Sequence, residues 1–223
     1  DDDDAPEPPA EPVSRLGEVY ELGPHRLVCW DSRDLDIWGL ATNGDADIRI
    51  HGDPPYGIDL LKKDASLGKS KTYRPIIGDD APFDPGFLLS VGVDTILWGA
   101  NHYANKLPNS DKWLVWDKQG GAKEVTYANC ELAWCSVHGP ARHITHVWDG
   151  FRRDSEKGVE RQHPNQKPVA VIVWALDQVF PKGCTVVEPY AGSGTTLIAA
   201  AQTGRIARLI ELDPRYCDVI RRR

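Results

Sequence analysis

Residues 184–203 read CTVVEPYAGSGTTLIAAAQT, and this stretch decides how the rest of the chain folds. Its first five residues are mostly apolar and end in an acid, Glu188, which predicts a buried strand, and the alanine-rich residues 195–203 predict a helix. Gly192 and Gly194 form the tight turn between them and let the backbone approach a ligand, while the first helical turn offers unpaired N–H groups. Strand, turn and helix together predict the ligand-binding unit of an α/β fold.

Three classes of nucleotide ligand compete for this turn. A triphosphate-binding loop requires lysine and then serine or threonine after the glycine, whereas Thr195 and Thr196 follow Gly194. A dinucleotide fingerprint has a third glycine where Leu197 stands. A nucleoside without a phosphate, such as S-adenosylmethionine, requires only the turn and an acid for the ribose hydroxyls, and Glu211 ends the next predicted strand about 20 residues further on. The turn therefore fits S-adenosylmethionine best.

A second informative stretch is Asp53-Pro54-Pro55-Tyr56-Gly57, which follows a half-apolar run over residues 47–52. Two consecutive prolines fix φ and keep the preceding residues extended, so Asp53 is expected at the carboxyl end of a strand in a stiff turn. A carboxylate, a free backbone carbonyl at Pro54 and an aromatic face suit a flat ring that carries an amino group. The alternative is a proline-capped turn around a core tyrosine, and the pentapeptide alone does not decide between them.

The remaining hydrophobic pattern predicts seven strands and five helices. The strands are expected over residues 27–31, 47–52, 94–98, 112–117, 131–137, 184–188 and 206–211, and the helices over 32–40, 83–91, 168–180, 195–203 and from Pro214 onward. Residues 1–16 are acidic and proline-rich and predict a disordered linker or tail, and residues 17–223 predict one domain. The polar, basic residues 59–80 predict a long mobile loop, and residues 138–162 show no clear period.

Charge and cysteine content bound the class of protein. The formal net charge is −7, but Asp1 to Asp4, Glu7 and Glu11 account for six of these charges, and cations cluster within residues 62–74 and 152–167. Such local clusters suit a phosphate backbone, although a solvated charged loop is the default for either one. The five cysteines are odd in number and form no C-x-x-C pair, and no run of apolar residues is long enough to span a membrane, which favours a cytoplasmic protein. Cys135, His138, His143 and His146 match no common zinc spacing, so no metal is expected.

Taken together, these stretches resemble the amino-methylating (N6-adenine and N4-cytosine) DNA methyltransferases, from about Leu27 to the end of the chain. Asp53–Tyr56 is similar to the catalytic motif of that family, residues 163–168 (HPNQKP) to its helix-opening cofactor motif, residues 188–196 to its glycine motif and residues 211–214 to its ribose-binding strand end. The catalytic motif precedes the glycine motif, as in the circularly permuted β-type branch. Protein-glutamine and many RNA methyltransferases with a similar turn have the opposite order.

The resemblance implies a Rossmann-like S-adenosylmethionine-dependent methyltransferase fold, with a seven-stranded, mostly parallel sheet and one antiparallel strand. It also implies that a base flipped out of duplex DNA is methylated on its exocyclic amine, with adenine N6 expected because an aspartate opens the motif. N4-cytosine methylation and a non-catalytic DNA-binding subunit are the alternatives. Sequence recognition is expected from residues 138–162, from loop 59–80, from a second subunit of a homodimer, or from a fused or partner domain.

The resemblance also implies roles for single residues. Asp53 and the Pro54 carbonyl would accept the amine hydrogens, Tyr56 would stack on the base, Lys167 with Asn165 would hold the methionine carboxylate, and Glu211 would hold the ribose. Asp31 would lie near the adenine of the cofactor; the alternatives are a helix cap for Asp31 and a solvated lysine for Lys167. The expected catalytic residues are Asp53, Pro54, Pro55 and Tyr56, and the expected cofactor-binding residues are Asp31, Asn165, Gln166, Lys167, Glu188, Tyr190, Gly192, Gly194, Thr195, Thr196 and Glu211.

Overall fold

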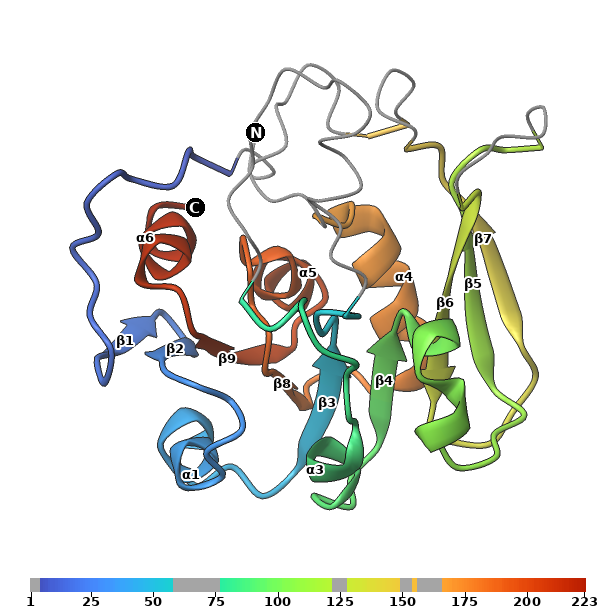
Figure 1. Ribbon diagram of the computed structural model, residues 1–223, viewed down its shortest axis with the longest axis horizontal. Coiled ribbons are helices and arrows are strands. Elements are labelled where there is room, and N and C mark those ends of the chain that lie inside the picture. The colour runs from blue at the N-terminus through green and yellow to red at the C-terminus, as the bar shows by residue number, and fades with distance from the viewer. Residues whose placement is uncertain (1–4, 58–76, 122–127, 149–153, 156–165) are drawn as a thin grey trace.

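The computed structural model describes residues 5–57, 77–121, 128–148, 154–155 and 166–223. These residues form one sheet of nine strands in the order β1-β2-β9-β8-β3-β4-β6-β5-β7 (Figure 1). The strands are β1 Val19–Leu22, β2 His25–Cys29, β3 Ile48–Gly52, β4 Thr95–Trp98, β5 Trp113–Asp117, β6 Cys130–Cys135, β7 Arg142–Thr145, β8 Thr185–Glu188 and β9 Ile206–Glu211.

The centre of the sheet is parallel, because the five strands β2, β9, β8, β3 and β4 pair in parallel with one another in that order. Strand β6 runs antiparallel to both β4 and β5, which confirms the single reversed strand among the seven predicted ones. Strand β2, the first of those seven along the chain, pairs with the last, β9. Strand β3, which leads into Asp53, lies beside strand β8, which leads into the glycine turn.

Two edge strands were not predicted, so the expected count of seven is corrected to nine in the described residues. Strand β1 pairs antiparallel with β2, and β7 pairs in parallel with β5. Three of the four residues of β7 are exposed, and β1 has no fully buried residue. Short edge strands of this kind bury little apolar surface and therefore carry almost no hydrophobic period.

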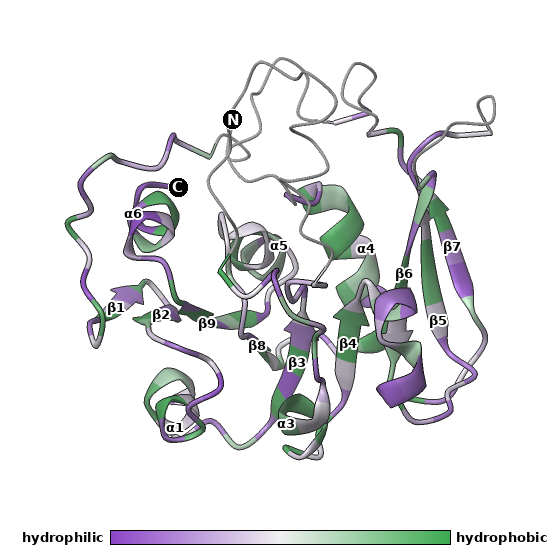
Figure 2. Cartoon of the chain, in the orientation of Figure 1, coloured by the Kyte–Doolittle hydropathy of each residue, from purple (hydrophilic) through white to green (hydrophobic). Residues whose placement is uncertain are grey.

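Helices cover both faces of the sheet, as the alternation of buried residues requires. On one face Val187 and Ile210 pack with α1 (Asp36–Thr42) and α3 (Gly86–Leu89). On the other face Val186 packs with α4 (Val169–Val179), and Leu209 packs with α5 (Thr195–Gln202) and α6 (Pro214–Arg222). Figure 2 shows the apolar residues concentrated along the central strands and the helix sides that face them.

The C-terminal helices agree with the sequence, and the N-terminal ones are shorter than expected. Helix α6 begins at Pro214, with Asp213 as an N-cap that accepts a hydrogen bond from the Arg215 amide. Helix α1 begins only at Asp36 and has no side-chain cap, so the expected helix start at residues 31–32 is wrong. The Asp31 side chain instead accepts a hydrogen bond from the Arg33 amide within a turn, a competing local bond that aspartate readily makes.

The acidic N-terminal segment contains an anchored stretch that its composition did not predict. The amides of Val13 and Ser14 and the Ser14 hydroxyl donate hydrogen bonds to the carboxylate of Asp218 on α6. Residues 1–4 and most of the loop expected over 59–80 lie outside the described residues, as does part of 138–162. Among the described helices, none is long and apolar enough to cross a membrane.

Candidate active site

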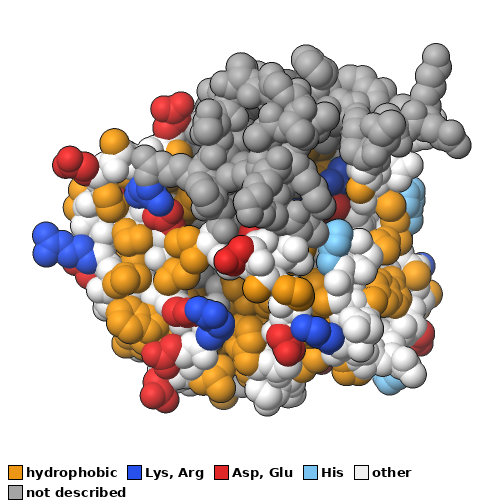
Figure 3. Space-filling view, in the orientation of Figure 1, with side chains coloured by type: hydrophobic (Ala, Val, Ile, Leu, Met, Phe, Trp, Pro, Cys, Tyr) orange, Lys and Arg blue, Asp and Glu red, His pale blue; other side chains and the backbone are white. Residues whose placement is uncertain are grey.

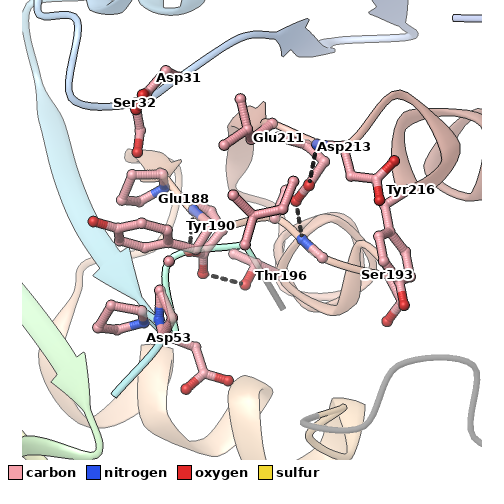
Figure 4. A pocket seen from close by; sticks show the side chains of 18 of the residues that line it. Asp31, Ser32, Asp53, Glu188, Tyr190, Ser193, Thr196, Glu211, Asp213 and Tyr216 are labelled. Atoms are coloured by element: carbon pink, nitrogen blue, oxygen red, sulfur yellow. Dashed lines mark hydrogen bonds between the residues drawn. The ribbon is translucent and has the colours of Figure 1, made fainter. Parts of the chain in front are cut away.

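A cavity of about 640 Å³ opens where the parallel strands β2, β3, β8 and β9 end. Ligands bind at this edge in open α/β sheets because the strand ends and the following helix starts converge there. Figure 4 shows acids from several strand ends around it, with Asp53 on one side and Glu211 on the other. The predicted residues that line the cavity are Asp31, Asp53, Pro54, Pro55, Gln166, Lys167, Glu188, Tyr190, Gly192, Thr195, Thr196 and Glu211.

Three predicted residues are not in this lining. Tyr56 and Gly194 lie beside the cavity, and Asn165 lies outside the described residues. Gly194 nevertheless has the conformation expected of it, since its φ is +85° and a Cβ there would approach Ile220 to 3.1 Å. The glycine is therefore required by the backbone and by the packing of α6 behind the turn.

The glycine end of the cavity is built around Glu188, whose side chain is buried. Its Oε1 accepts a hydrogen bond from the Tyr190 amide, and its Oε2 accepts one from the Thr196 hydroxyl at 3.0 Å and lies 2.7 Å from Nδ1 of His51. Trp98 donates to Nε2 of His51, so in the neutral ring Nδ1 carries the proton and donates it to Glu188. Burial raises the pKa of Glu188 above its ordinary value, because its partners only partly offset the lost solvation.

Glu211 closes the same end of the cavity with a similar arrangement. Its Oε2 accepts a hydrogen bond from the Gly192 amide at 2.7 Å, and its Oε1 accepts one from the Asp213 amide at 2.8 Å (Figure 4). Burial raises its pKa to about 7, since backbone amides stabilise the carboxylate less than a full positive charge would. Each oxygen still has a second lone pair for a ligand hydroxyl.

The Asp53 end has the opposite character, because a buried ammonium group lies against the carboxylate. Nζ of Lys167 is 2.5 Å from Asp53 Oδ1 and 3.1 Å from Oε2 of Glu131 on β6, and Lys167 is only 5% exposed. Burial lowers the pKa of Lys167, but the carboxylates of Asp53 and Glu131 outweigh it and raise that pKa above its usual value. The alternative of a solvated lysine is therefore wrong. Lys167 also lines the cavity, and its contact with a methionine carboxylate stays a prediction.

Tyr56 is locked in place rather than presented to the cavity. Its hydroxyl donates to Asp53 Oδ1 at 2.5 Å, and its ring stacks on His102 with centroids 5.1 Å apart. The ring lies so close to Gly99 that a Cβ there would be 2.0 Å from it, and the φ of +65° at Gly99 also favours glycine. Burial, together with the nearby Asp53 carboxylate, raises the pKa of the Tyr56 phenol well above its usual value, so the phenol stays protonated and donates.

Several contributors were missed by the sequence interpretation. His51, Trp98, His102 and Glu131 looked like ordinary strand or loop residues, since their partners are distant in the chain. Other missed lining residues lie within or close to recognised motifs, namely Trp30, Ser32, Arg33, Ser193, Asp213 and Tyr216, whereas Phe83 lies far from any of them in the sequence. Most of these lining residues could have been found by including the neighbours of each recognised motif residue.

A glycine turn on the central strand and an acid on the next strand define a nucleotide-binding α/β protein. More narrowly, residues 81–222 match the family model of the N6/N4 DNA methylases. Because this match covers more than half of the chain, the protein belongs to that family. It includes the glycine turn, Lys167 and Glu211, and it begins after Asp53.

Among curated relatives, the type II methyltransferase M2.DpnII of Streptococcus pneumoniae is 24% identical over 136 residues, which is 59% of this chain and 50% of that protein. M.ScaI of Streptomyces caespitosus is 38% identical over 74 residues, or 33% of this chain and 23% of the relative. The chain thus spans about half or less of the length of these relatives.

Solved structures share the fold. The cytosine-N4-specific DNA methyltransferase PvuII aligns with a TM-score of 0.55 at 12% identity, over 95% of this chain and 89% of its own. The complex of M1.HpyAVI with S-adenosylmethionine aligns with a TM-score of 0.51 at 18% identity, over 88% of this chain and 97% of the M1.HpyAVI chain. The fold is that of the S-adenosylmethionine-dependent DNA methyltransferases.

Proposed function

We propose that this protein is an S-adenosylmethionine-dependent DNA methyltransferase that methylates the exocyclic amine of a flipped base, namely N6 of adenine. The observation that carries the proposal is the single cavity in which Asp53 faces a glycine turn and the acids Glu188 and Glu211. The membership of the chain in the N6/N4 DNA methylase family supports it. We extend the proposal to the circularly permuted β-type organisation.

The chemistry of the cavity fits S-adenosylmethionine. The carboxylate of Glu211 would accept the ribose hydroxyls, and the acids Asp31, Glu188 and Asp213 suit a ligand that carries a sulfonium and an amino group. Glycine at positions 192 and 194 keeps side chains out of the turn, and Tyr190 and Phe83, with ring centroids 5.9 Å apart, offer apolar surface for the adenine. When bound, the cofactor supplies an electrophilic methyl group.

The residues of this chain would act on the amine by position and by charge. Extruding the base from the duplex costs a few kcal/mol, which binding in the pocket has to offset. Asp53 and the Pro54 carbonyl would accept the two amine hydrogens and so direct the nitrogen lone pair, while the Tyr56 phenol fixes the Asp53 carboxylate from behind. The cavity wall formed by Pro54, Pro55 and Phe83 would exclude water from the neutral amine when it attacks the sulfonium methyl group.

Duplex DNA is the proposed partner, read by residues outside the cavity. The expected cation clusters at 62–74 and 152–167 fall largely outside the described residues. On the face seen in Figure 3 the described acidic and basic side chains are interspersed rather than gathered in one patch. Sequence recognition is therefore proposed for residues 59–80 and 138–162, for a second subunit or for a further domain.

The test is incubation of the protein with labelled S-adenosylmethionine and unmethylated bacterial genomic DNA, followed by digestion and mass analysis of the nucleosides. N6-methyladenine is expected. N4-methylcytosine would keep the reaction class and correct the base. Absence of any methylated nucleoside, with cofactor binding intact, would favour the non-catalytic DNA-binding subunit.

A further inference from the structure

Four charged side chains of alternating sign run from the β5–β6 hairpin to the candidate catalytic carboxylate. Lys118, just after β5, pairs with Oε1 of Glu131 on β6, and Oε2 of Glu131 is 3.1 Å from Nζ of Lys167. Nζ of Lys167 is in turn 2.5 Å from Asp53 Oδ1. Glu131 is not among the residues that line the cavity, and the Lys167 ammonium lies between it and Asp53.

We propose that Glu131 is a positioning residue for methyl transfer, which holds the Lys167 ammonium between two carboxylates and thereby sets the orientation and acceptor strength of Asp53. This inference rests on the proposed function, because it assigns Asp53 to the base amine.

The geometry gives the first reason. Asp53 Oδ1 receives both the Lys167 ammonium and the Tyr56 hydroxyl, each at 2.5 Å. Among the described residues none donates a hydrogen bond to Oδ2, and Asp53 lines the cavity. The two donors on Oδ1 therefore fix the carboxylate and leave Oδ2 for an amine hydrogen.

Charge balance gives the second reason. A buried ammonium with Asp53 as its one counter-ion would neutralise that carboxylate and weaken it as an acceptor. Glu131 shares the ammonium, so the partly buried group of Asp53, Lys167 and Glu131 keeps a net negative charge. Lys118 balances that charge from the outer side.

The ionisation of Glu131 is consistent with this role. Burial raises the pKa of Glu131, but the ammonium groups of Lys167 and Lys118 outweigh it and lower the pKa to about 2. Among the described residues, the groups that face Lys167 are the carboxylates of Asp53 and Glu131, the Tyr56 hydroxyl at 3.2 Å and the ring of Trp98 with its centroid at 5.4 Å. Burial lowers the pKa of Lys167, and the carboxylates of Asp53 and Glu131 raise it. Without the Glu131 carboxylate, only Asp53 would oppose the effect of burial, so the pKa of Lys167 would fall.

The experiment replaces Glu131 by Gln and compares turnover, its pH profile and the titration of Lys167. We expect kcat to fall about tenfold, with the dissociation constant of S-adenosylmethionine and the KM for DNA within about twofold. The alkaline limb of kcat should move down by about one pH unit. The Cε resonance of labelled Lys167, assigned by its loss in Lys167→Met, should titrate lower by the same amount.

Two further variants separate positioning from folding. Glu131→Asp keeps the charge and should restore the alkaline limb and most of kcat. Glu21→Gln removes the carboxylate of another paired strand glutamate, which is 59% exposed and far from the cavity, and should change none of these quantities.

The outcomes are distinct. If kcat and the Lys167 titration are unchanged in Glu131→Gln, the inference fails, and it also fails if kcat falls while the alkaline limb stays in place. If the wild-type protein methylates no DNA, the proposed function fails, and the Lys167 titration still decides whether Glu131 controls that ammonium.

Discussion

Both ends of the cavity contain acidic residues, but the groups that surround the carboxylates differ between the two ends. At the Asp53 end, carboxylates lie against a buried ammonium, and the pKa of Glu131 is lowered to about 2 because Lys167 and Lys118 outweigh its burial. At the glycine end, the partners of the Glu211 carboxylate among the described residues are backbone amides, and burial raises its pKa to about 7. The acids at one end thus have ammonium partners, and Glu211 at the other end has backbone amides as partners.

This difference separates two tasks that a transferase has to perform. A carboxylate that is held by an ammonium and a phenol suits an amine that must be oriented in every turnover. An acid with backbone amides as its partners suits a ligand that itself carries positive charge and hydroxyl donors, since the ligand then supplies the cation and the donors. The contrast makes the predictions below specific to one end of the cavity.

The largest effect is expected from Asp53→Ala, because this change removes the acceptor itself. Methyl transfer should fall by a hundredfold to ten-thousandfold, the usual range for a positioned catalytic group. The affinity for S-adenosylmethionine, measured by calorimetry, should stay within about tenfold. Asp53→Asn is the matched variant that keeps the shape of the side chain. Turnover above about a hundredth of the wild type in Asp53→Ala would contradict the assignment.

The second effect concerns the dependence of stability on pH. The folded-state pKa of Glu211 is raised from 4.5 to about 7, so its contribution to stability is full below pH 4.5 and is lost as the pH rises through 7. Relative to Glu211→Gln, the wild type should lose about 3 kcal/mol of unfolding free energy between pH 4.5 and 8. Urea unfolding at several pH values measures the difference.

Glu131→Gln is expected to give the opposite dependence of stability on pH. The pKa of Glu131 is lowered, so its contribution is present above pH 4.5 and is lost only as the pH falls through about 2. Between pH 4.5 and 8 the difference in unfolding free energy between wild type and Glu131→Gln should therefore be constant. If the difference in unfolding free energy from the wild type changed with pH in the same way for Glu211→Gln and Glu131→Gln, the electrostatic contrast between the two ends would be contradicted.

The sequence predicted the parts of this architecture that depend on local pattern. The central strands, the three C-terminal helices and the strand-end acids Asp53, Glu188 and Glu211 follow from hydrophobic period, glycine and proline. The resemblance to a methyltransferase family then predicted a mostly parallel sheet with one antiparallel strand.

What the sequence could not predict depends on contacts between distant residues. The contacts of Lys167 with Asp53 in the β3 turn and with Glu131 on β6 were not predicted, because no local pattern marks Glu131 as a partner. His51 likewise looked like a strand residue, although it joins Glu188 to Trp98. Strand β7 escaped prediction because its exposed residues have no apolar alternation.

A third prediction addresses cofactor affinity at the glycine end. Glu211→Ala should weaken S-adenosylmethionine binding by about tenfold to a hundredfold, because an acceptor of charge-assisted hydrogen bonds is worth roughly 1.5–3 kcal/mol. Glu211→Gln keeps an acceptor and should bind with intermediate affinity. Calorimetry measures both, and unchanged binding in Glu211→Ala would remove Glu211 from the ribose.

The smallest effect is expected where a cation at the glycine end lies in solvent. Arg33 pairs with Asp31 at 2.6 Å, and its guanidinium holds the pKa of Asp31 below its usual value. The Arg33 side chain is 74% exposed, so solvent screens the pair, and such pairs contribute about 0–1 kcal/mol. Arg33→Ala should therefore change the free energy of unfolding by less than about 1 kcal/mol.

The buried lysine is the matched contrast for this pair. Lys167→Met leaves Asp53 and Glu131 without their shared ammonium at low exposure, and breaking a buried pair costs roughly 3–5 kcal/mol. The two variants, unfolded in urea side by side at neutral pH, compare an exposed and a buried cation beside the same cavity. A loss of stability in Arg33→Ala as large as that in Lys167→Met would mean that burial does not separate the two ends. A larger loss in Lys167→Met alone is the result that the geometry requires.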